Sequence, residues 1–204
     1  MKKGMSFSVF FILIIFFLIF ISIVFFTQKN YKSKIYGNNK DVDEIEEYLL
    51  NIESYKANID VTIISNKNEN QYKIEQIVKP FSSKMIVKQP DSISNMELIY
   101  ENGTLEIKNT ELNVSKVYHD YPYLSNNMLF LTDYIKTYGE SVSKSIEEYE
   151  DAIYVKIEKE DNIYNKKQIL RINKQNLKPE SMEIQNINNQ TKIYILYNDI
   201  ELNI

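Results

Sequence analysis

The segment from Phe7 to Phe26 is apolar apart from two serines, and it contains no charged residue and no proline. A helix of about twenty residues, with a rise of about 1.5 Å per residue, spans roughly the thickness of the hydrocarbon core of a bilayer. The run ends without the small residues of a signal-peptide cleavage site, and a helix of a globular core would have a polar face. The sequence therefore predicts an uncleaved transmembrane signal anchor over residues 7–26.

This anchor divides the chain into a short leader and a long remainder. We expect residues 1–6 to form a cytoplasmic leader, residues 27–40 a polar tether, and residues 41–204 one extracytoplasmic domain. Lysines flank both ends of the apolar run, so the positive-inside rule alone gives no direction. A leader this short before a domain this long is typical of a single-pass protein whose carboxyl-terminal domain faces outward.

Composition restricts the chemistry that the chain can perform. The sequence contains no Cys, one His and four Gly. The lack of Cys excludes disulfides, thiolate metal sites and a lipidated cysteine, and a single His disfavours both a histidine metal site and a serine–histidine catalytic pair. The few glycines match none of the phosphate-binding loops. We therefore expect no enzyme activity, no cofactor and no metal site.

Charge is distributed unevenly along the chain. The formal net charge is −4, from 24 basic and 28 acidic residues. Six of the basic residues and none of the acidic ones lie in residues 1–40, which leaves 18 basic and 28 acidic residues, a net charge of −10, from Asp41 onward. Such a domain is repelled by anionic lipid and by nucleic acid. We therefore expect a basic envelope protein as its partner and no nucleic-acid binding.

Two segments have apolar residues at helical spacing. The first follows a predicted N-cap at Asp41, with Glu44 as its capping-box partner, and runs to about Glu53. The second is closed by Gly139 as a predicted C-cap. Its apolar stripe consists of Leu124, Met128, Leu131, Ile135 and Tyr138.

Most of the remaining apolar residues alternate with polar ones, which is the pattern of strands with one buried face. Asn102-Gly103 separates two such runs and predicts a tight hairpin turn. The runs cover residues 59–63, 72–78, 85–87, 96–100, 105–107, 114–118, 153–157, 169–172, 182–184, 193–197 and 200–204. The pattern predicts an α+β fold, mainly antiparallel β, with a curved sheet of about ten strands covered by two or more helices.

The order of these elements and four short motifs resemble the LolA/LolB superfamily of periplasmic lipoprotein carriers. The motifs are the helix-to-strand entry Ile52–Ala57, the hairpin Leu98–Gly103, the segment Leu170–Met182 and the closing strand Tyr197–Asn203. The resemblance covers residues 41–204. It implies an incomplete antiparallel β-barrel, a half-barrel that helices close.

Within that superfamily, a membrane-held domain looks most similar to the GerS family of spore formers. This resemblance implies a role in sporulation or germination, in which the protein binds and supports the amidase that prepares cortex peptidoglycan. It places the domain at the membrane, or in the intermembrane space of a developing spore. GerS proteins are typically lipoproteins, and because this chain has no Cys, the anchor over residues 7–26 would replace the lipid. The alternative is a lipid or lipoprotein carrier of the LolA type.

The candidate contact residues lie just before and within the second predicted helix. Three tyrosines cluster in front of it, and Tyr is enriched where proteins bind proteins. In the carrier alternative, the apolar stripe of the helix holds acyl chains against the sheet. The candidate partner or lipid contacts are therefore Tyr118, Tyr121, Tyr123, Leu124, Met128, Leu131, Ile135 and Tyr138.

Three other patterns have simple structural explanations. His119 and Asp120 suggest a general base, but adjacent residues of a strand point to opposite sides. The acidic runs 147–151 and 158–162 lack the Gly turn of a calcium loop and are expected to be solvated turns. Open strand edges, including the terminal strand 197–204, leave a homodimer by strand exchange as an open alternative.

Overall fold

The computed structural model describes residues 42–121, 128–159 and 162–203. The predicted leader, transmembrane segment and tether lie outside the described residues, and so does the predicted N-cap Asp41. Among the residues that are described, no helix is both long and apolar enough to cross a membrane.

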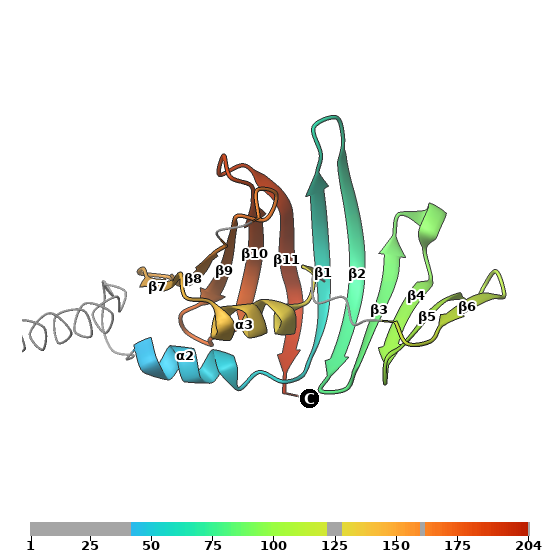
Figure 1. Cartoon of the computed structure of the whole chain (residues 1–204), viewed down its shortest axis with the longest axis horizontal. Coiled ribbons are helices and arrows are strands. Elements are labelled where there is room, and N and C mark those ends of the chain that lie inside the picture. Colours follow the sequence, from blue (N-terminus) through green and yellow to red (C-terminus); the bar gives the residue numbers. More distant parts are fainter. Residues whose placement is uncertain (1–41, 122–127, 160–161, 204) are drawn as a thin grey trace, which may run out of the picture. The chain divides into compact units, whose positions relative to one another are not determined.

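Eleven strands form one antiparallel sheet in the described part of the chain (Figure 1). Their order is β6-β5-β4-β3-β2-β1-β11-β10-β9-β8-β7, so the first and last strands pair at the centre of the sheet. The edges are β6 and β7, so the sheet is open. The strands are β1 (Tyr55–Ile64), β2 (Glu69–Lys79), β3 (Ser82–Gln89), β4 (Met96–Glu101), β5 (Thr104–Asn109), β6 (Val114–Tyr118), β7 (Lys144–Glu148), β8 (Ala152–Glu158), β9 (Lys167–Asn173), β10 (Pro179–Gln185) and β11 (Thr191–Leu202).

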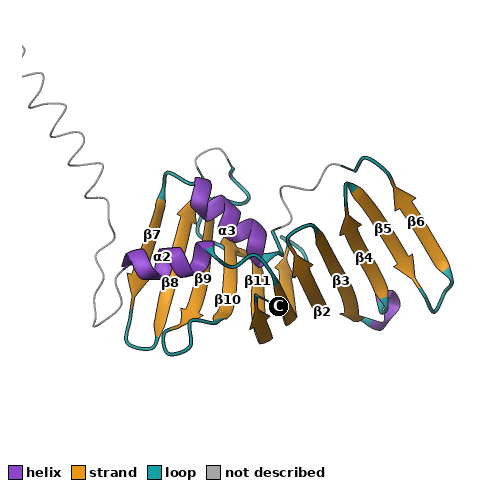
Figure 2. Ribbon diagram, turned by 90° about the horizontal axis from the view of Figure 1, so that it is seen from below, coloured by secondary structure: helices purple, strands orange, loops and turns teal. Residues whose placement is uncertain are grey.

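Within the described residues, two α-helices, α2 (Val42–Leu50) and α3 (Leu131–Glu140), accompany the sheet, and a short 3-10 helix, η1 (Asp91–Ile93), follows β3. Figure 2 shows that α2 and α3 both lie over the strands β7 to β11, whereas β3 to β6 extend away without a helix over them. We call β1 with β7–β11 the covered half and β4–β6 the open wing. The strands β2 and β3 join the two.

The hydrophobic core lies between the two helices and the covered half. From the helices come Ile45 and Leu49 of α2 and the buried residues Leu131, Tyr134, Ile135 and Tyr138 of α3. Every second side chain of the strands in the covered half faces them, as the period of two predicts. The buried strand residues include Tyr55, Ala57, Ile59, Val61, Ile146, Ile153, Val155, Ile157, Leu170, Ile172, Met182, Ile195 and Ile200.

Gly139 lies inside α3, so the predicted C-cap at this position is wrong. The helix continues to Glu140, and the N–H of Ser141 donates to the carbonyl of Tyr138 at 3.3 Å. Gly139 does not have the positive φ that a glycine C-cap adopts. A Cβ atom at this position would lie 3.3 Å from Cδ2 of Leu50. The glycine therefore allows α3 to approach the end of α2 closely.

Both helices are shorter in the structure than the sequence predicts. The first ends at Leu50 instead of near Glu53, and Ile52 is buried after the helix has ended. The second begins at Leu131, because Phe130 has an extended backbone and Met128 lies in a turn. Apolar residues outside a helix can continue its spacing by chance, so the pattern does not show whether a terminal apolar residue lies inside the helix or beyond its end.

The strand predictions are mostly confirmed. Asn102 and Gly103 form the β4–β5 turn with φ values of 48° and 76°, as the hairpin motif requires. Strand β7 has no counterpart in the prediction, because Ile146 is its only apolar residue. The last two predicted runs are one strand, β11, whose register against β1 shifts between Asn58 and Ile59.

Candidate functional site

The open wing continues the core-facing surface of the sheet beyond the helices. Met85 of β3 pairs with Leu98, which pairs with Ile107, and a neighbouring row joins Tyr100, Leu105 and Tyr118. Paired residues of antiparallel strands share a face, so all of these side chains lie on the same side as the core. Met85 is buried, whereas the wing residues are only half-buried. The wing thus presents an apolar face that no helix covers within the described residues.

The opposite face of the wing is charged. Glu97 of β4 lies 3.0 Å from the ammonium of Lys84 and 3.7 Å from that of Lys108. On the adjoining strands, the ammonium of Lys88 lies 3.0 Å from Glu75. Its hydrogen bond lowers the pKa of the Glu75 carboxyl. The charged face of the wing is therefore suited to solvent, and the apolar face is suited to a partner.

Two of the three predicted tyrosines come together at the wing edge. The rings of Tyr118 and Tyr121 have centroids 5.9 Å apart and are tilted by 58°. The N–H of Tyr121 donates to the carbonyl of Gly103 at 2.8 Å, which fixes this segment beside the β4–β5 turn. The ammonium of Lys116 lies 4.9 Å from the centre of the Tyr118 ring, a cation–π distance.

The other predicted contact residues have different positions. Leu131, Ile135 and Tyr138 are buried in the core, where they pack between α3 and the sheet. Met128 precedes the helix, and its Sδ atom lies 3.1 Å from Nδ2 of Asn165. Tyr123 and Leu124 lie outside the described residues. A contact role for any of the eight residues stays a prediction.

A buried hydrogen-bond network holds the start of α3 against the sheet. The hydroxyl of Tyr55 on β1 donates to Oε1 of Gln76 on β2 at 2.8 Å and accepts from the N–H of Leu131 at 3.1 Å. Nε2 of Gln76 donates to the carbonyl of Leu129 at 3.2 Å. The N-cap residue Phe130 has no side chain that can cap the helix. The tyrosine hydroxyl therefore satisfies a helix N–H that would otherwise lack a partner.

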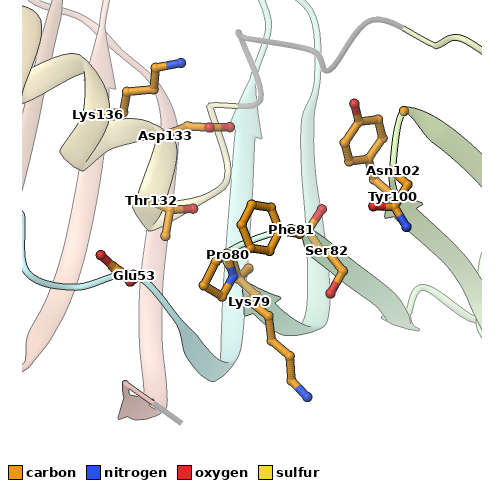
Figure 3. Close-up of a pocket in the computed structure, with 13 residues that line it drawn as sticks. Glu53, Lys79, Pro80, Phe81, Ser82, Tyr100, Asn102, Thr132, Asp133 and Lys136 are labelled. Atoms are coloured by element: carbon orange, nitrogen blue, oxygen red, sulfur yellow. The ribbon is translucent and has the colours of Figure 1, made fainter.

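A cavity of about 390 Å³ lies beside this fixed helix start, between α3, the β2–β3 turn and the β4–β5 hairpin (Figure 3). Pro80 and Phe81 of the turn and Tyr100 of the wing provide its apolar surface. Across from Phe81 lie Thr132 and Asp133 in the first turn of α3. The cavity therefore adjoins the apolar face of the wing through Tyr100.

Sequence reasoning did not identify Phe81 as a candidate. It is one of two residues between β2 and β3, and it is 84% exposed. Hairpin turns are usually formed by Gly, Asn, Asp, Ser or Pro. A large aromatic residue at such a turn is a signal that could have been found in the sequence.

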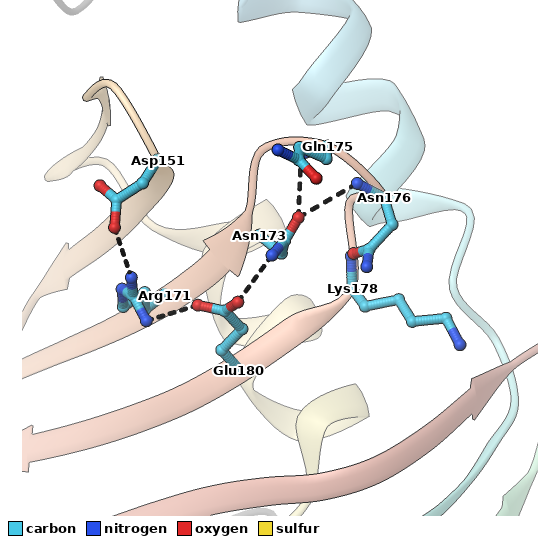
Figure 4. A network of polar contacts seen from close by, with 7 residues as sticks. All are labelled: Asp151, Arg171, Asn173, Gln175, Asn176, Lys178 and Glu180. Atoms are coloured by element: carbon cyan, nitrogen blue, oxygen red, sulfur yellow. Dashed lines mark hydrogen bonds and ion pairs between the residues drawn. The ribbon is translucent and has the colours of Figure 1, made fainter.

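A polar network on the covered half is explained by its structural role (Figure 4). Arg171 of β9 pairs with Asp151 at 2.9 Å and with Glu180 of β10. Asn173 donates from Nδ2 to Glu180 at 2.8 Å, and its Oδ1 accepts from the backbone N–H groups of the following turn. These contacts fix the β9–β10 hairpin, which is part of the Leu170–Met182 motif. Elsewhere, the described residues, His119 among them, contain no group of three or more potential His, Cys, Asp or Glu ligands.

Solved structures show the same fold at low identity. The complex of the CwlD amidase with the GerS lipoprotein from Clostridioides difficile matches with 19% identity and a TM-score of 0.50, over 81% of this chain and 98% of that chain. An uncharacterized conserved protein from Thermus thermophilus matches with 8% identity and a TM-score of 0.51, over 80% and 88% of the two chains. The LolA superfamily protein NE2245 from Nitrosomonas europaea matches with 14% identity and a TM-score of 0.43, over 81% of this chain and 95% of that chain. The match to the first of these structures confirms the predicted GerS-like fold.

The family itself is identified by the sequence. Among curated proteins, none matches this chain. A family model described as "Sporulation protein YdcC-like" matches residues 8–204. This match covers nearly the whole sequence, including the entire sheet and both helices. The chain therefore belongs to the family of YdcC-like sporulation proteins.

Proposed function

We propose that this protein is a non-catalytic binding protein of the sporulating cell envelope, and that its open wing holds a cortex peptidoglycan amidase. The observation that carries the proposal is the apolar face of β4–β6, which continues the core surface without a helix over it. Exposed apolar patches on a folded domain mark sites of protein or membrane contact. The wing is thus the surface that a partner would complete.

The choice of an amidase rests on similarity of fold. GerS, with which this chain shares its fold at 19% identity, is seen in complex with the CwlD amidase. Membership of a sporulation family is consistent with a partner that acts during spore formation. The net charge of −10 from Asp41 onward favours a partner with a basic surface. These features support an amidase over a nucleic acid or an anionic lipid surface.

The proposal includes a membrane anchor and the absence of catalysis. Residues 7–26 would span the membrane once and leave the domain on the extracytoplasmic side, or in the intermembrane space of a developing spore. A sequence with no Cys and one His offers few groups for nucleophilic or acid–base chemistry. The protein would therefore act by placing the amidase near the membrane.

Capture from sporulating cells tests this proposal. The tagged full-length chain, solubilised in detergent, should recover a cell-wall amidase, which mass spectrometry would identify. Ile107→Asp places a charge on the apolar face of the wing and should abolish recovery. Val142→Asp is a suitable control because Val142 is fully exposed and lies outside the wing. If the wild-type chain recovers no amidase, the proposed partner is wrong; if Ile107→Asp still recovers it, the wing is not the binding surface.

A further inference from the structure

The cavity beside the wing has an unusual apolar side chain at its entrance. Phe81 lies at the β2–β3 turn next to Pro80 and is 84% exposed. Figure 3 shows its ring between the first turn of α3 and the wing residue Tyr100. An exposed aromatic ring on a short hairpin gains nothing for the fold from burial, because little of it is buried. Together with Pro80 and Tyr100 it forms an apolar surface that another molecule could contact.

Charges of both signs surround this apolar centre. Lys79 and Lys136 contribute two positive charges to the cavity lining, and Glu53 and Asp133 contribute two negative ones. Figure 3 shows the ammonium groups of both lysines directed away from the Phe81 ring. An apolar centre with a mixed polar rim is the anatomy of a protein–protein contact site. A site for lipid headgroups or nucleic acid would instead have an excess of positive charge.

Hydrogen bonds within the domain hold the walls of the cavity. The start of α3 is held by the buried Tyr55–Gln76 network, and the β4–β5 hairpin is held by the bond from Tyr121 to Gly103. A preformed cavity loses little conformational freedom on binding. A volume of about 390 Å³ is in the range of pockets that bury a compact group.

We propose that this cavity is the socket for one large apolar side chain, aromatic or aliphatic, on a protruding loop of a protein partner. Phe81 and Tyr100 would contact that side chain, and the charged rim would face polar groups around it. The inference rests on the proposed function in one respect, namely that the partner is the protein held by the wing. It adds the position of the anchor and the chemistry that the partner must present.

Photo-crosslinking in sporulating cells tests the socket without assuming the partner's identity. Benzoylphenylalanine at position 81 of the full-length chain should form an adduct of protein mass. The matched control is position 164, because Tyr164 is also aromatic, is 77% exposed and lies in the β8–β9 loop. It should give no such adduct. No adduct at position 81, or an adduct of lipid mass, overturns the proposal.

Binding with purified components decides the remaining outcomes. The crosslinked protein, once identified and purified, should bind the full-length chain in detergent about 30-fold more weakly after Phe81→Ser, the effect of losing a hot-spot residue. Thr132→Trp, which fills the cavity while Phe81 is kept, should weaken binding as strongly, and Tyr164→Ser should leave it unchanged. Unchanged binding by the first two variants overturns the socket. If the first two variants lose binding but the partner is not an amidase, the socket stands and the proposed function fails. If the partner is an amidase that binds all variants equally, the proposed function stands and the socket fails.

Discussion

The covered half and the open wing share one sheet and one sequence pattern, but they differ in what lies over them. In both, apolar residues alternate with polar ones and pair across strands on the same face. Leu170 in the covered half is fully buried beneath the helices, whereas Leu105 in the wing is only half-buried. The comparison shows that alternation specifies which face is apolar, and that tertiary contacts decide whether the face is covered.

The two edge strands of the sheet, β7 and β6, also differ in how well they are protected against contacts. Strand β7, at the covered edge, has the buried carboxylate of Glu148, whose partner Lys174 lies 2.7 Å away. An inward-pointing charge hinders the addition of another strand. Strand β6, at the edge of the wing, exposes Val114 and Val117 and has one charged residue, Lys116. The covered half is thus closed to contacts along its edge, and the wing is less protected.

The largest expected difference concerns the cost of removing a leucine. Leu170→Ala should destabilise the fold by about 2–5 kcal/mol, because it leaves a cavity in a packed core. Leu105→Ala should cost about 1 kcal/mol or less, because the side chain is already partly in water. Urea unfolding of the full-length chain in detergent, followed by circular dichroism, measures both. Equal costs would mean that the wing is as well covered as the other half.

Removal of a lysine should give the next largest contrast. Lys174→Met leaves the buried carboxylate of Glu148 without its ion pair and should cost about 3 kcal/mol. Lys108→Met on the wing should cost less than about 0.5 kcal/mol, since Glu97 there keeps Lys84 and is near solvent. The same unfolding measurement applies. A small cost for Lys174→Met would show that water reaches Glu148.

Particular residues show which differences between the covered half and the open wing can be predicted from the sequence. The alternation predicted the strands, and Asn102-Gly103 predicted the central hairpin of the wing, because these are local signals. The position of α3 was not predictable, since it depends on bonds among Tyr55, Gln76 and Leu131 that connect distant parts of the chain. The pairing of β1 with β11, which brings the first and last strands together within the covered half, is equally non-local.

For the candidate site, one part was predictable from the sequence and the other was not. Tyr118 and Tyr121 are close in the chain, and the structure places them together on the wing. The helical stripe was predicted as a contact surface; Leu131 and Ile135 lie in the core, and their contact role stays a prediction, because periodicity cannot tell which surface a helix meets. The cavity joins residues from α3, β2–β3 and β4–β5, so no single segment could indicate it.

The network that connects the halves should have an intermediate effect. Gln76→Leu removes the hydrogen bonds to Tyr55 and to the carbonyl of Leu129, leaving buried polar groups unsatisfied, and should cost about 1–3 kcal/mol. Gln71→Leu is the matched control on the same strand, because Gln71 is exposed and donates locally, to Glu69. Hydrogen exchange should also show faster opening of α3 in the first variant. Unchanged exchange in α3 would mean that core packing alone holds the helix.

The smallest expected effect concerns the charged face where the halves meet. Lys88 lowers the pKa of Glu75, so the ionised carboxyl is favoured in the folded state. Its stabilisation is present above the unfolded pKa of about 4.3 and is lost as the pH falls through the lower folded value. Both side chains are partly exposed, so the pair should contribute less than about 1 kcal/mol. Glu75→Gln should therefore lower stability slightly at pH 7 and make no difference once the pH is well below the lowered folded pKa, as urea unfolding at several pH values would show. A difference that persists at low pH would assign the effect of Glu75 to packing on the sheet instead of to its charge.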